Sequence, residues 1–205
     1  MSSIKKIVVL ASGEGTNFSA IVESGIEVSR VITNNPNANV INRAKKAGVG
    51  SHLIVPDKPG KAFTADVYRK EYDKQIDYFI GGQGSRDLPN PYSVDLIVLA
   101  GWMRIFSPWF CEKWAGKIVN IHPSLLPAFA GSCNAIEDAY NYGCKVVGVT
   151  VHWVTPEVDS GPIIAQEVKH IFPGQSLETV KKDVHNLEHY LYPKTIKELI
   201  VWKNL

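Results

Sequence analysis

The sequence predicts an α/β protein with a Rossmann-like, mostly parallel sheet, covered by helices on both faces and finished by an antiparallel C-terminal edge. Short, fully apolar runs such as Ile7–Ala11 and Leu96–Ala100 alternate with helical patterns. Strands without polar alternation are typical of parallel sheets buried on both faces. After about residue 144 the runs are longer and carry polar residues, which indicates a half-exposed sheet edge.

The first part of the chain contains four strand–helix units and a fifth strand. The apolar runs predict strands at Ile7–Ala11, Val28–Ile32, His52–Val55, Leu96–Ala100 and Lys117–His122. Between them, helices are predicted at Asn17–Glu23, Val40–Ala47, Ala62–Ile76 and Pro108–Trp114. Gly48 is a typical helix stop and Pro108 a typical helix start. Right-handed crossovers then give a Rossmann-like half.

The last part of the chain is predicted as two strands and a closing helix. Val146–Val154 and Ile163–Ile171 are joined by Thr155–Pro162, which is too long for a tight hairpin. Leu177–Ile200 follows as a helix that we expect to be bent or interrupted at Pro193. Gly81–Ser93, rich in glycine and proline, is predicted as an exposed loop. The length of 205 residues fits one domain, with halves 1–100 and 101–205.

Composition excludes several functional classes. The formal net charge is +2, from 22 basic and 20 acidic residues, so nothing suggests a nucleic-acid partner or an anionic membrane. Cys111, Cys133 and Cys144 are odd in number and match no zinc spacing, which favours free thiols in a reducing compartment. No apolar run is long enough for a signal peptide or a membrane span. We therefore expect a soluble, cytoplasmic protein.

A glycine-containing loop, Ser12–Asn17, lies between the first strand and the first helix. Unpaired amides at a helix N-terminus favour an anion, and glycines allow close backbone approach to a phosphate. The third glycine of a dinucleotide fingerprint is replaced by Phe18, and no acid follows the second strand at Thr33–Asn35. The loop therefore favours a phosphomonoester over NAD, although a plain strand–helix turn fits the same residues.

Asn120 and His122 end the fifth predicted strand, two residues apart and so on one face. Histidine can exchange a proton near neutral pH, and the asparagine amide can donate to a developing oxyanion. Asp159, in the loop Thr155–Pro162, would favour the protonated form of His122 if the two side chains meet. Local turn hydrogen bonds explain the strand end equally well, and Asp159 fits a turn former.

Together with these features, several further motifs occur in a specific order. They are Ala100–Ile105, Asn120–Pro127, Gly148–Val154, Asp159–Ile164, Glu188–His189 and Tyr192–Pro193. Over nearly the whole chain the sequence resembles the folate-dependent formyltransferases. The resemblance implies a single domain of the formyltransferase fold that moves a formyl group from 10-formyltetrahydrofolate to the amine of glycinamide ribonucleotide, in purine biosynthesis, without a metal or NAD.

The resemblance also implies roles for individual residues. The catalytic set would be Asn120, His122 and Asp159, and the substrate would contact Gly15, Thr16, Asn17 and Glu188. The folate would contact Arg69, Met103, Arg104, Ile105, Phe106, Asn120, Thr155, Glu157 and Val158. The halves 1–100 and 101–205 would then bind phosphate and carry out catalysis with folate, respectively. His152 is interpreted as structural, and the partners expected are small molecules, for a monomer or a homodimer.

Two segments depart from the family pattern. After Pro127 the family usually has a histidine-containing loop, whereas Ala128–Ala135 contains no histidine and no basic residue. The resemblance therefore does not extend to the substrate contact of this loop. Asp77–Asp95 is longer and richer in glycine than expected, which fits a surface insertion or an oligomer contact.

Three other functions share some of these features. Formyltetrahydrofolate hydrolases and methionyl-tRNA formyltransferases share the Asn-x-His and Asp core, but they carry an N-terminal regulatory domain and a C-terminal barrel, respectively. The chain begins at its first strand and ends soon after the closing helix, so we expect neither. A non-catalytic sensor of nucleotide or folate would need no proton donor, and a turnover assay separates it from an enzyme.

Overall fold

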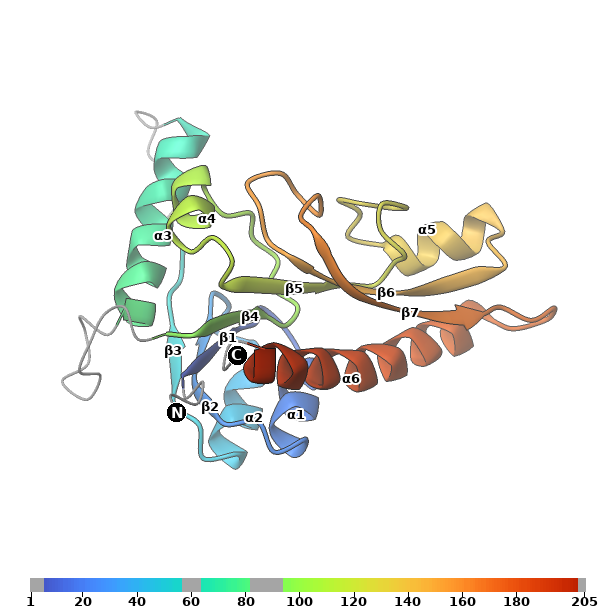
Figure 1. Cartoon of the computed structure of the whole chain (residues 1–205), viewed down its shortest axis with the longest axis horizontal. Coiled ribbons are helices and arrows are strands. Elements are labelled where there is room, and N and C mark those ends of the chain that lie inside the picture. Colours follow the sequence, from blue (N-terminus) through green and yellow to red (C-terminus); the bar gives the residue numbers. More distant parts are fainter. Residues whose placement is uncertain (1–5, 57–63, 82–93, 203–205) are drawn as a thin grey trace.

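A computed structural model describes residues 6–56, 64–81 and 94–202, which form one seven-stranded sheet. The strand order is β3-β2-β1-β4-β5-β6-β7, and the strands from β3 to β5 pair in parallel. β6 pairs antiparallel with β5, and β7 pairs antiparallel with β6 (Figure 1). The predicted fold class, a mostly parallel sheet with an antiparallel C-terminal edge, is therefore confirmed.

The elements follow the predicted order, with one addition. The strands are β1 (Ile7–Leu10), β2 (Val28–Thr33), β3 (Ser51–Leu53), β4 (Leu96–Leu99), β5 (Ile118–His122), β6 (Val146–Trp153) and β7 (Ile163–His170). The helices are α1 (Thr16–Glu23), α2 (Val40–Lys46), α3 (Ala65–Gly81), α4 (Pro108–Lys113), α5 (Ala135–Tyr142) and α6 (Leu177–Trp202). The addition is α5, which the sequence did not predict.

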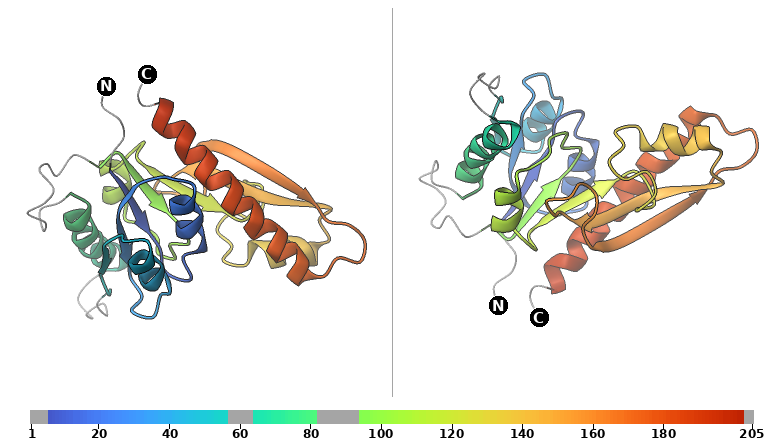
Figure 2. Two further views of the ribbon diagram at one scale, coloured as in Figure 1. Left: turned by 90° about the horizontal axis from the view of Figure 1, so that it is seen from below. Right: turned by 90° about the horizontal axis from the view of Figure 1, so that it is seen from above.

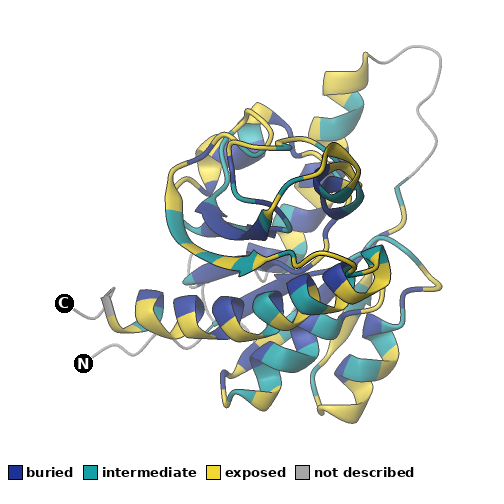
Figure 3. Cartoon of the chain, turned by 90° about the vertical axis from the view of Figure 1, so that its right-hand side faces the viewer, coloured by how far each residue is buried: buried dark blue, intermediate teal, exposed yellow. Residues whose placement is uncertain are grey.

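The sheet has a core on each face because alternate residues of its buried strands point to opposite sides. Ile7 and Val9 of β1 pack in a core with α1, α2 and α6, whereas Val8 and Leu10 pack in a second core with α3 and α4. Figure 2 shows the same arrangement from below and from above, and Figure 3 shows buried residues concentrated along the sheet. Helices thus cover both faces, as the apolar strands predict.

Three predicted boundaries were wrong. α3 does not end at Ile76 but continues to Gly81, because Ile76 and Ile80 lie one helical turn apart and both are buried. Gly81 is therefore a buried helix end and not loop; the rest of the predicted loop, residues 82–93, lies outside the described residues. β3 ends at Leu53, two residues earlier than predicted.

α6 is not interrupted at Pro193, which lies inside one continuous helix. Proline removes one backbone donor from a helix, and strong packing on either side can hold the helix through that loss. Tyr192 beside it is fully buried, and its hydroxyl lies 2.9 Å from the carbonyl oxygen of Leu99 and 3.1 Å from that of Val119. This contact fixes α6 under β4 and β5, whose carboxyl ends carry the candidate site.

None of the helices in the described ranges is long and apolar enough to cross a membrane.

Candidate active site

A cavity of about 290 Å³ lies at the carboxyl ends of β4 and β5, where parallel sheets bind ligands. Its lining comes from three places: the segment after β4, the end of β5, and the loop between β6 and β7. Asn120, His122 and Asp159, which the sequence singles out, all line it. The topology thus brings together residues that are far apart in the chain.

Asn120 and His122 share one face of β5, as their spacing predicts. Val119 and Ile121 point into the core on the other side, so the alternation leaves the two polar side chains facing the cavity. The His122 side chain is only 8% exposed. A buried imidazole needs partners, and its two ring nitrogens both have one.

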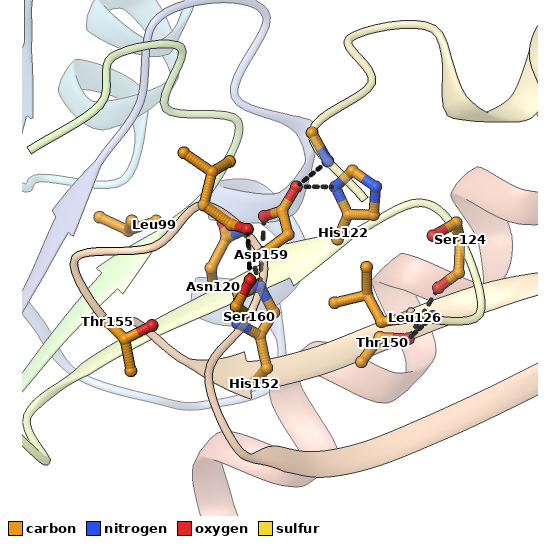
Figure 4. A network of polar contacts seen from close by, with 12 residues as sticks. Leu99, Asn120, His122, Ser124, Leu126, Thr150, His152, Thr155, Asp159 and Ser160 are labelled. Carbon is orange, nitrogen blue, oxygen red and sulfur yellow. Dashed lines mark hydrogen bonds and ion pairs between the residues drawn. The ribbon is translucent and has the colours of Figure 1, made fainter. Parts of the chain in front are cut away.

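His122 lies between a carboxylate and a carbonyl. Its Nδ1 is 3.3 Å from Oδ2 of Asp159 (Figure 4). Its Nε2 is 3.2 Å from the carbonyl oxygen of Phe129. The carbonyl can only accept, so Nε2 carries a proton in this arrangement. A second proton, on Nδ1, would give an imidazolium facing the carboxylate.

Asp159 is held in an unusual position by its own backbone. Its φ is 51°, a left-handed conformation that non-glycine residues rarely adopt. Its carboxylate accepts a hydrogen bond from the amide of Gly131 at 2.9 Å, in the loop after Pro127, while other polar groups hold the turn: the hydroxyls of Thr155 and Ser160 donate to the carbonyls of Glu157 and Val158. The carboxylate therefore points away from its own turn and toward His122.

His152, which the sequence analysis treats as structural, belongs to the same cluster. The antiparallel register places it directly opposite Asn120, and its Nε2 is 3.2 Å from Nδ2 of Asn120. Burial lowers its pKa, which favours the neutral ring. Its Nδ1 lies 2.9 Å from the carbonyl oxygen of Trp153, an acceptor, so Nδ1 carries the single proton and Nε2 accepts from the Asn120 amide.

The tautomer of His152 decides which of two neighbouring groups, Asn120 or Asp159, its Nε2 can bind. Oδ1 of Asp159 also lies 3.6 Å from Nε2 of His152. Two acceptors cannot bond to each other, so the carboxylate has its ion pair with His122 and not with His152. The sequence contained one signal for His152, which is a polar residue where its strand is otherwise apolar. The structure shows that this residue is buried.

The glycine loop opens α1 without a side-chain cap, which leaves the first amides of the helix unpaired. Gly15 has φ of 72°, and a Cβ there would lie 2.7 Å from the side chain of Val40. Glycine is therefore required at this position by backbone conformation and by packing against α2. Its presence is no evidence for a phosphate, whereas the uncapped helix end is consistent with one.

Asn17 and Glu188 meet beside this helix end. Both are buried, and Nδ2 of Asn17 lies 3.5 Å from Oε2 of Glu188, while Oδ1 of Asn17 is buried without a hydrogen-bond partner. His185, to which the sequence analysis assigned no role, lies 3.1 Å from the same Glu188 oxygen. That hydrogen bond raises the pKa of His185, although partial burial opposes it.

The segment after β4 forms one wall of the cavity. Met103 and Ile105 are 71% and 52% exposed, which is unusual for large apolar side chains next to a cavity. Phe106 instead is buried and stacks on Phe110 at 4.4 Å between ring centroids. Arg104 lies with its guanidinium 4.5 Å from the centre of the Tyr72 ring. The exposed side chains leave an apolar surface free for a flat ligand.

The opposite wall is the loop between β6 and β7, which contributes Thr155, Glu157 and Val158. Arg69 is not among the lining residues; it lies on α3, 3.5 Å from Asp66. Asn17, Gly15, Thr16 and Glu188 also lie outside the cavity lining, at the end of α1. The structure thus separates the predicted residues into a cavity group and a helix-end group.

The cavity group and the helix-end group are connected by two hydrogen bonds from backbone amides. The Ser12 amide donates to the carbonyl of Gly101, and the Met103 amide donates to the Ser12 hydroxyl at 3.0 Å. In the described parts of the chain, no three His, Cys, Asp or Glu side chains are arranged to hold a metal ion.

Comparison with known proteins agrees with this geometry. Residues 5–196 match a family model described as formyl transferase. A phosphoribosylglycinamide formyltransferase of Bacillus subtilis is 38% identical, covering 98% of this chain and 97% of that protein, and one of Haemophilus influenzae is 40% identical, covering 95% and 86%. The crystal structure of glycinamide ribonucleotide transformylase 1 from Geobacillus kaustophilus superposes with a TM-score of 0.81, at 38% identity over 96% of this chain and 99% of that one.

Proposed function

The chain belongs to the formyl transferase family, and from that premise we propose that Asn120, His122 and Asp159 carry out formyl transfer onto a ribonucleotide amine. The protein is a phosphoribosylglycinamide formyltransferase of purine biosynthesis. It transfers the formyl group of 10-formyltetrahydrofolate to glycinamide ribonucleotide, giving formylglycinamide ribonucleotide and tetrahydrofolate. The observation that supports the catalytic assignment is the 3.3 Å approach of Asp159 to His122 inside one cavity.

The reaction begins when the amine of glycinamide ribonucleotide attacks the formyl carbon. A C–N bond forms, and the formyl oxygen takes up the electron pair as a tetrahedral oxyanion. The Asn120 amide and the imidazolium of His122 stabilise this negative charge, and such preorganised donors are often the largest single contribution to catalysis. The bond to N10 of the folate then breaks, and a proton passes from the attacking amine to N10.

Asp159 supports the charged form of His122. Its Oδ2 lies 3.3 Å from Nδ1 of His122, where it can accept from that nitrogen and form an ion pair with the imidazolium during the reaction. The Nε2–H of His122 donates to the Phe129 carbonyl, and it must leave this acceptor to donate to the oxyanion during the reaction. The Gly131 amide keeps Asp159 aligned during the exchange because it binds the carboxylate from another loop.

His152 orients Asn120. As a neutral acceptor at 3.2 Å, its Nε2 takes one N–H of the amide and so fixes which end of the amide faces the cavity. The second N–H of Asn120 is then directed to the oxyanion. This interpretation corrects the purely structural role that the strand pattern suggested for His152.

The remaining site residues divide between the two ligands. We assign the substrate phosphate to the amides of Gly15, Thr16 and Asn17 and the rest of the ribonucleotide to Glu188, since these groups lie at one helix end. The folate would lie against Met103, Arg104, Ile105 and Phe106, with Asn120, Thr155, Glu157 and Val158 opposite and Arg69 as an outer contact. In this scheme residues 1–100 are the phosphate-binding half and residues 101–205 the catalytic and folate-binding half.

The ligands are small molecules, and we propose that the protein acts in the cytoplasm as a monomer or a homodimer. Two observations support that compartment: Cys111, Cys133 and Cys144 are all free thiols, and no described helix could cross a membrane.

A turnover assay tests this proposal. The purified protein is incubated with glycinamide ribonucleotide and 10-formyltetrahydrofolate, and tetrahydrofolate and formylated ribonucleotide are measured together. Equal amounts of both products are expected. Tetrahydrofolate without formylated ribonucleotide would instead indicate hydrolysis, and binding without either product would indicate a sensor.

A further inference from the structure

One buried carboxylate has no place in the catalytic scheme. Asp73, in the middle of α3, is 1% exposed and is not among the residues that line the cavity. Burying a carboxylate is costly unless it is strongly paired. Oδ2 of Asp73 accepts a short hydrogen bond, 2.6 Å, from the amide of Ser107. Hydrogen bonds from the side chain and the amide of Ser107 both lower the pKa of Asp73, so this carboxylate is bound chiefly to Ser107.

Ser107 is the residue at which the cavity wall ends. Its own hydroxyl accepts from the Phe110 amide at 3.4 Å and so caps α4. At the other end of the wall, the Met103 amide is held by the Ser12 hydroxyl. The stretch from Met103 to Phe106 is thus held at both ends by hydrogen bonds. The Met103 amide donates to Ser12 in the loop after β1, and the Ser107 amide donates to Asp73.

Two positive charges lie near the same carboxylate, one on Arg104 in the wall and one on Arg69 in α3. Arg104 and Arg69 both lie close enough for their positive charges to lower the pKa of Asp73. Arg104 also lies over the ring of Tyr72, whose hydroxyl donates to the Ile54 carbonyl at 2.7 Å. On the α4 side the facing titratable group is the Cys111 thiol, whose pKa is raised to about 11, mostly by burial and in part by the Asp73 charge.

We infer that Asp73 is a positioning residue for the folate. Its carboxylate holds the wall residues 103–106 in the conformation that binds folate, through the Ser107 amide and the Arg104 guanidinium. Asp73 touches no ligand in this scheme. It keeps Met103 and Ile105 exposed toward the cavity and keeps the Arg104 guanidinium on Tyr72. The inference rests on the proposed function, since it takes the cavity to be the folate site.

A dependence on pH follows from this arrangement. Burial raises the pKa of the Asp73 carboxyl to about 6, although hydrogen bonding to Ser107 and the charges of Arg104 and Arg69 lower it. The charged form, which attracts Arg104, is therefore present above pH 6 and is lost as the pH falls through about 6. Folate binding should weaken over the same interval, because a protonated Asp73 binds the Ser107 amide less strongly and no longer attracts Arg104.

The test compares Asp73→Asn with Asp77→Asn. Asparagine keeps an acceptor for the Ser107 amide but removes the charge. Asp77 is the matched control, one helical turn further along α3: its carboxylate binds Lys113 at 2.6 Å and Trp114 Nε1 at 3.0 Å, so it also joins α3 to α4 but does not contact the wall. For each variant, kcat and both KM values are measured between about pH 5 and pH 8, after a thermal melt has shown that it is folded.

We expect Asp73→Asn to raise the KM for 10-formyltetrahydrofolate about tenfold at pH 7.5, with little change in kcat or in the KM for the ribonucleotide. The ratio of variant to wild-type folate KM should approach one as the pH falls through about 6, because both side chains are then neutral. An unchanged folate KM, a ratio independent of pH, or the same shift in Asp77→Asn would overturn the inference.

Two further results separate this inference from the proposed function. If the wild-type protein does not turn over, the proposed function fails; if it turns over and Asp73→Asn behaves like wild type, only the inference fails. If Asp73→Asn does not fold, calorimetry of tetrahydrofolate binding to the wild-type protein decides. Its affinity should fall as the pH drops through about 6, and a constant affinity would contradict the inference.

Discussion

The catalytic cavity and the phosphate end of this molecule are built differently. In the cavity, Asn120, His122, His152 and Asp159 are all connected to one another or to backbone groups. At the phosphate end, α1 has no side-chain cap, and Asn17 has a buried oxygen without a partner. Each of these four side chains in the cavity has a protein partner, whereas the helix end and Asn17 leave polar groups unmatched.

This difference reflects what each region has to do. A catalytic group must already be aligned when charge develops, so its partners belong to the protein. In a binding site for an anion, by contrast, the hydrogen-bond donors have no partner in the protein and are satisfied only by the ligand. Substitutions of the four clustered cavity residues should therefore lower kcat, and substitutions at the helix end should raise the KM for the ribonucleotide.

The largest effect is expected at His122. His122→Gln keeps a neutral donor for the oxyanion but cannot carry a positive charge, so kcat should fall about 10³-fold with nearly unchanged KM values. Steady-state kinetics with both substrates measures this. A loss of less than about tenfold would mean that the charge on His122 contributes little.

His152 should give a smaller effect of the same kind. His152→Phe preserves a buried ring but removes the acceptor for the Asn120 amide, so kcat should fall on the order of 10–10²-fold. A rise in KM without a fall in kcat would argue that His152 only fills space. Circular dichroism and a thermal melt confirm that the variant is folded.

At the phosphate end, Glu188→Gln should change binding and not chemistry. We expect the KM for the ribonucleotide to rise about tenfold, with the folate KM and kcat nearly constant. Because the hydrogen bond to Glu188 raises the pKa of His185, the variant should also lower that pKa, which NMR titration of the imidazole measures.

The His185–Glu188 pair also predicts a pH dependence of stability. The pKa of His185 is raised in the folded state, so the pair stabilises the fold fully below the ordinary histidine pKa of 6.5 and loses this contribution as the pH rises through the raised value. Glu188→Gln should therefore lower the melting temperature at pH 5 more than at about pH 9. An equal shift at both pH values would contradict the pairing.

The smallest effect is expected at Arg104. Its guanidinium is partly exposed and stacks on Tyr72, so Arg104→Ala should raise the folate KM about fivefold and leave kcat nearly unchanged. A fall in kcat larger than the rise in KM would place Arg104 in the transition state and so break the division between binding and catalysis.

The sequence predicts the parallel part of the fold well because several of its strands are apolar throughout, as in Ile7–Leu10 and Leu96–Leu99. α5 was missed because only Ala135, Ile136 and Ala139 of its eight residues are buried, too few for a clear helical period. The predicted bend or interruption at Pro193 was wrong, since the packing of Tyr192 keeps α6 continuous.

The site was predicted where neighbouring residues carry the signal, as in Asn120 and His122. His152 was missed because its role depends on the antiparallel register that places it opposite Asn120, and register between distant strands cannot be derived from composition or spacing. A glycine at position 15 is required by its positive φ and by the packing of Val40, so its identity alone is no signal for a phosphate, and the phosphate contact of its amide stays a prediction.

The central claim, that Asp159 keeps His122 charged for catalysis, is tested most directly by Asp159→Asn. This substitution keeps the shape and removes the charge 3.3 Å from Nδ1 of His122. The turnover number is measured together with calorimetric affinities for glycinamide ribonucleotide and tetrahydrofolate. We predict a fall in kcat on the order of 10²–10³, with both affinities within about threefold of wild type. A folded variant that turns over at nearly the wild-type rate would show that Asp159 only forms the turn, and the mechanism would be wrong.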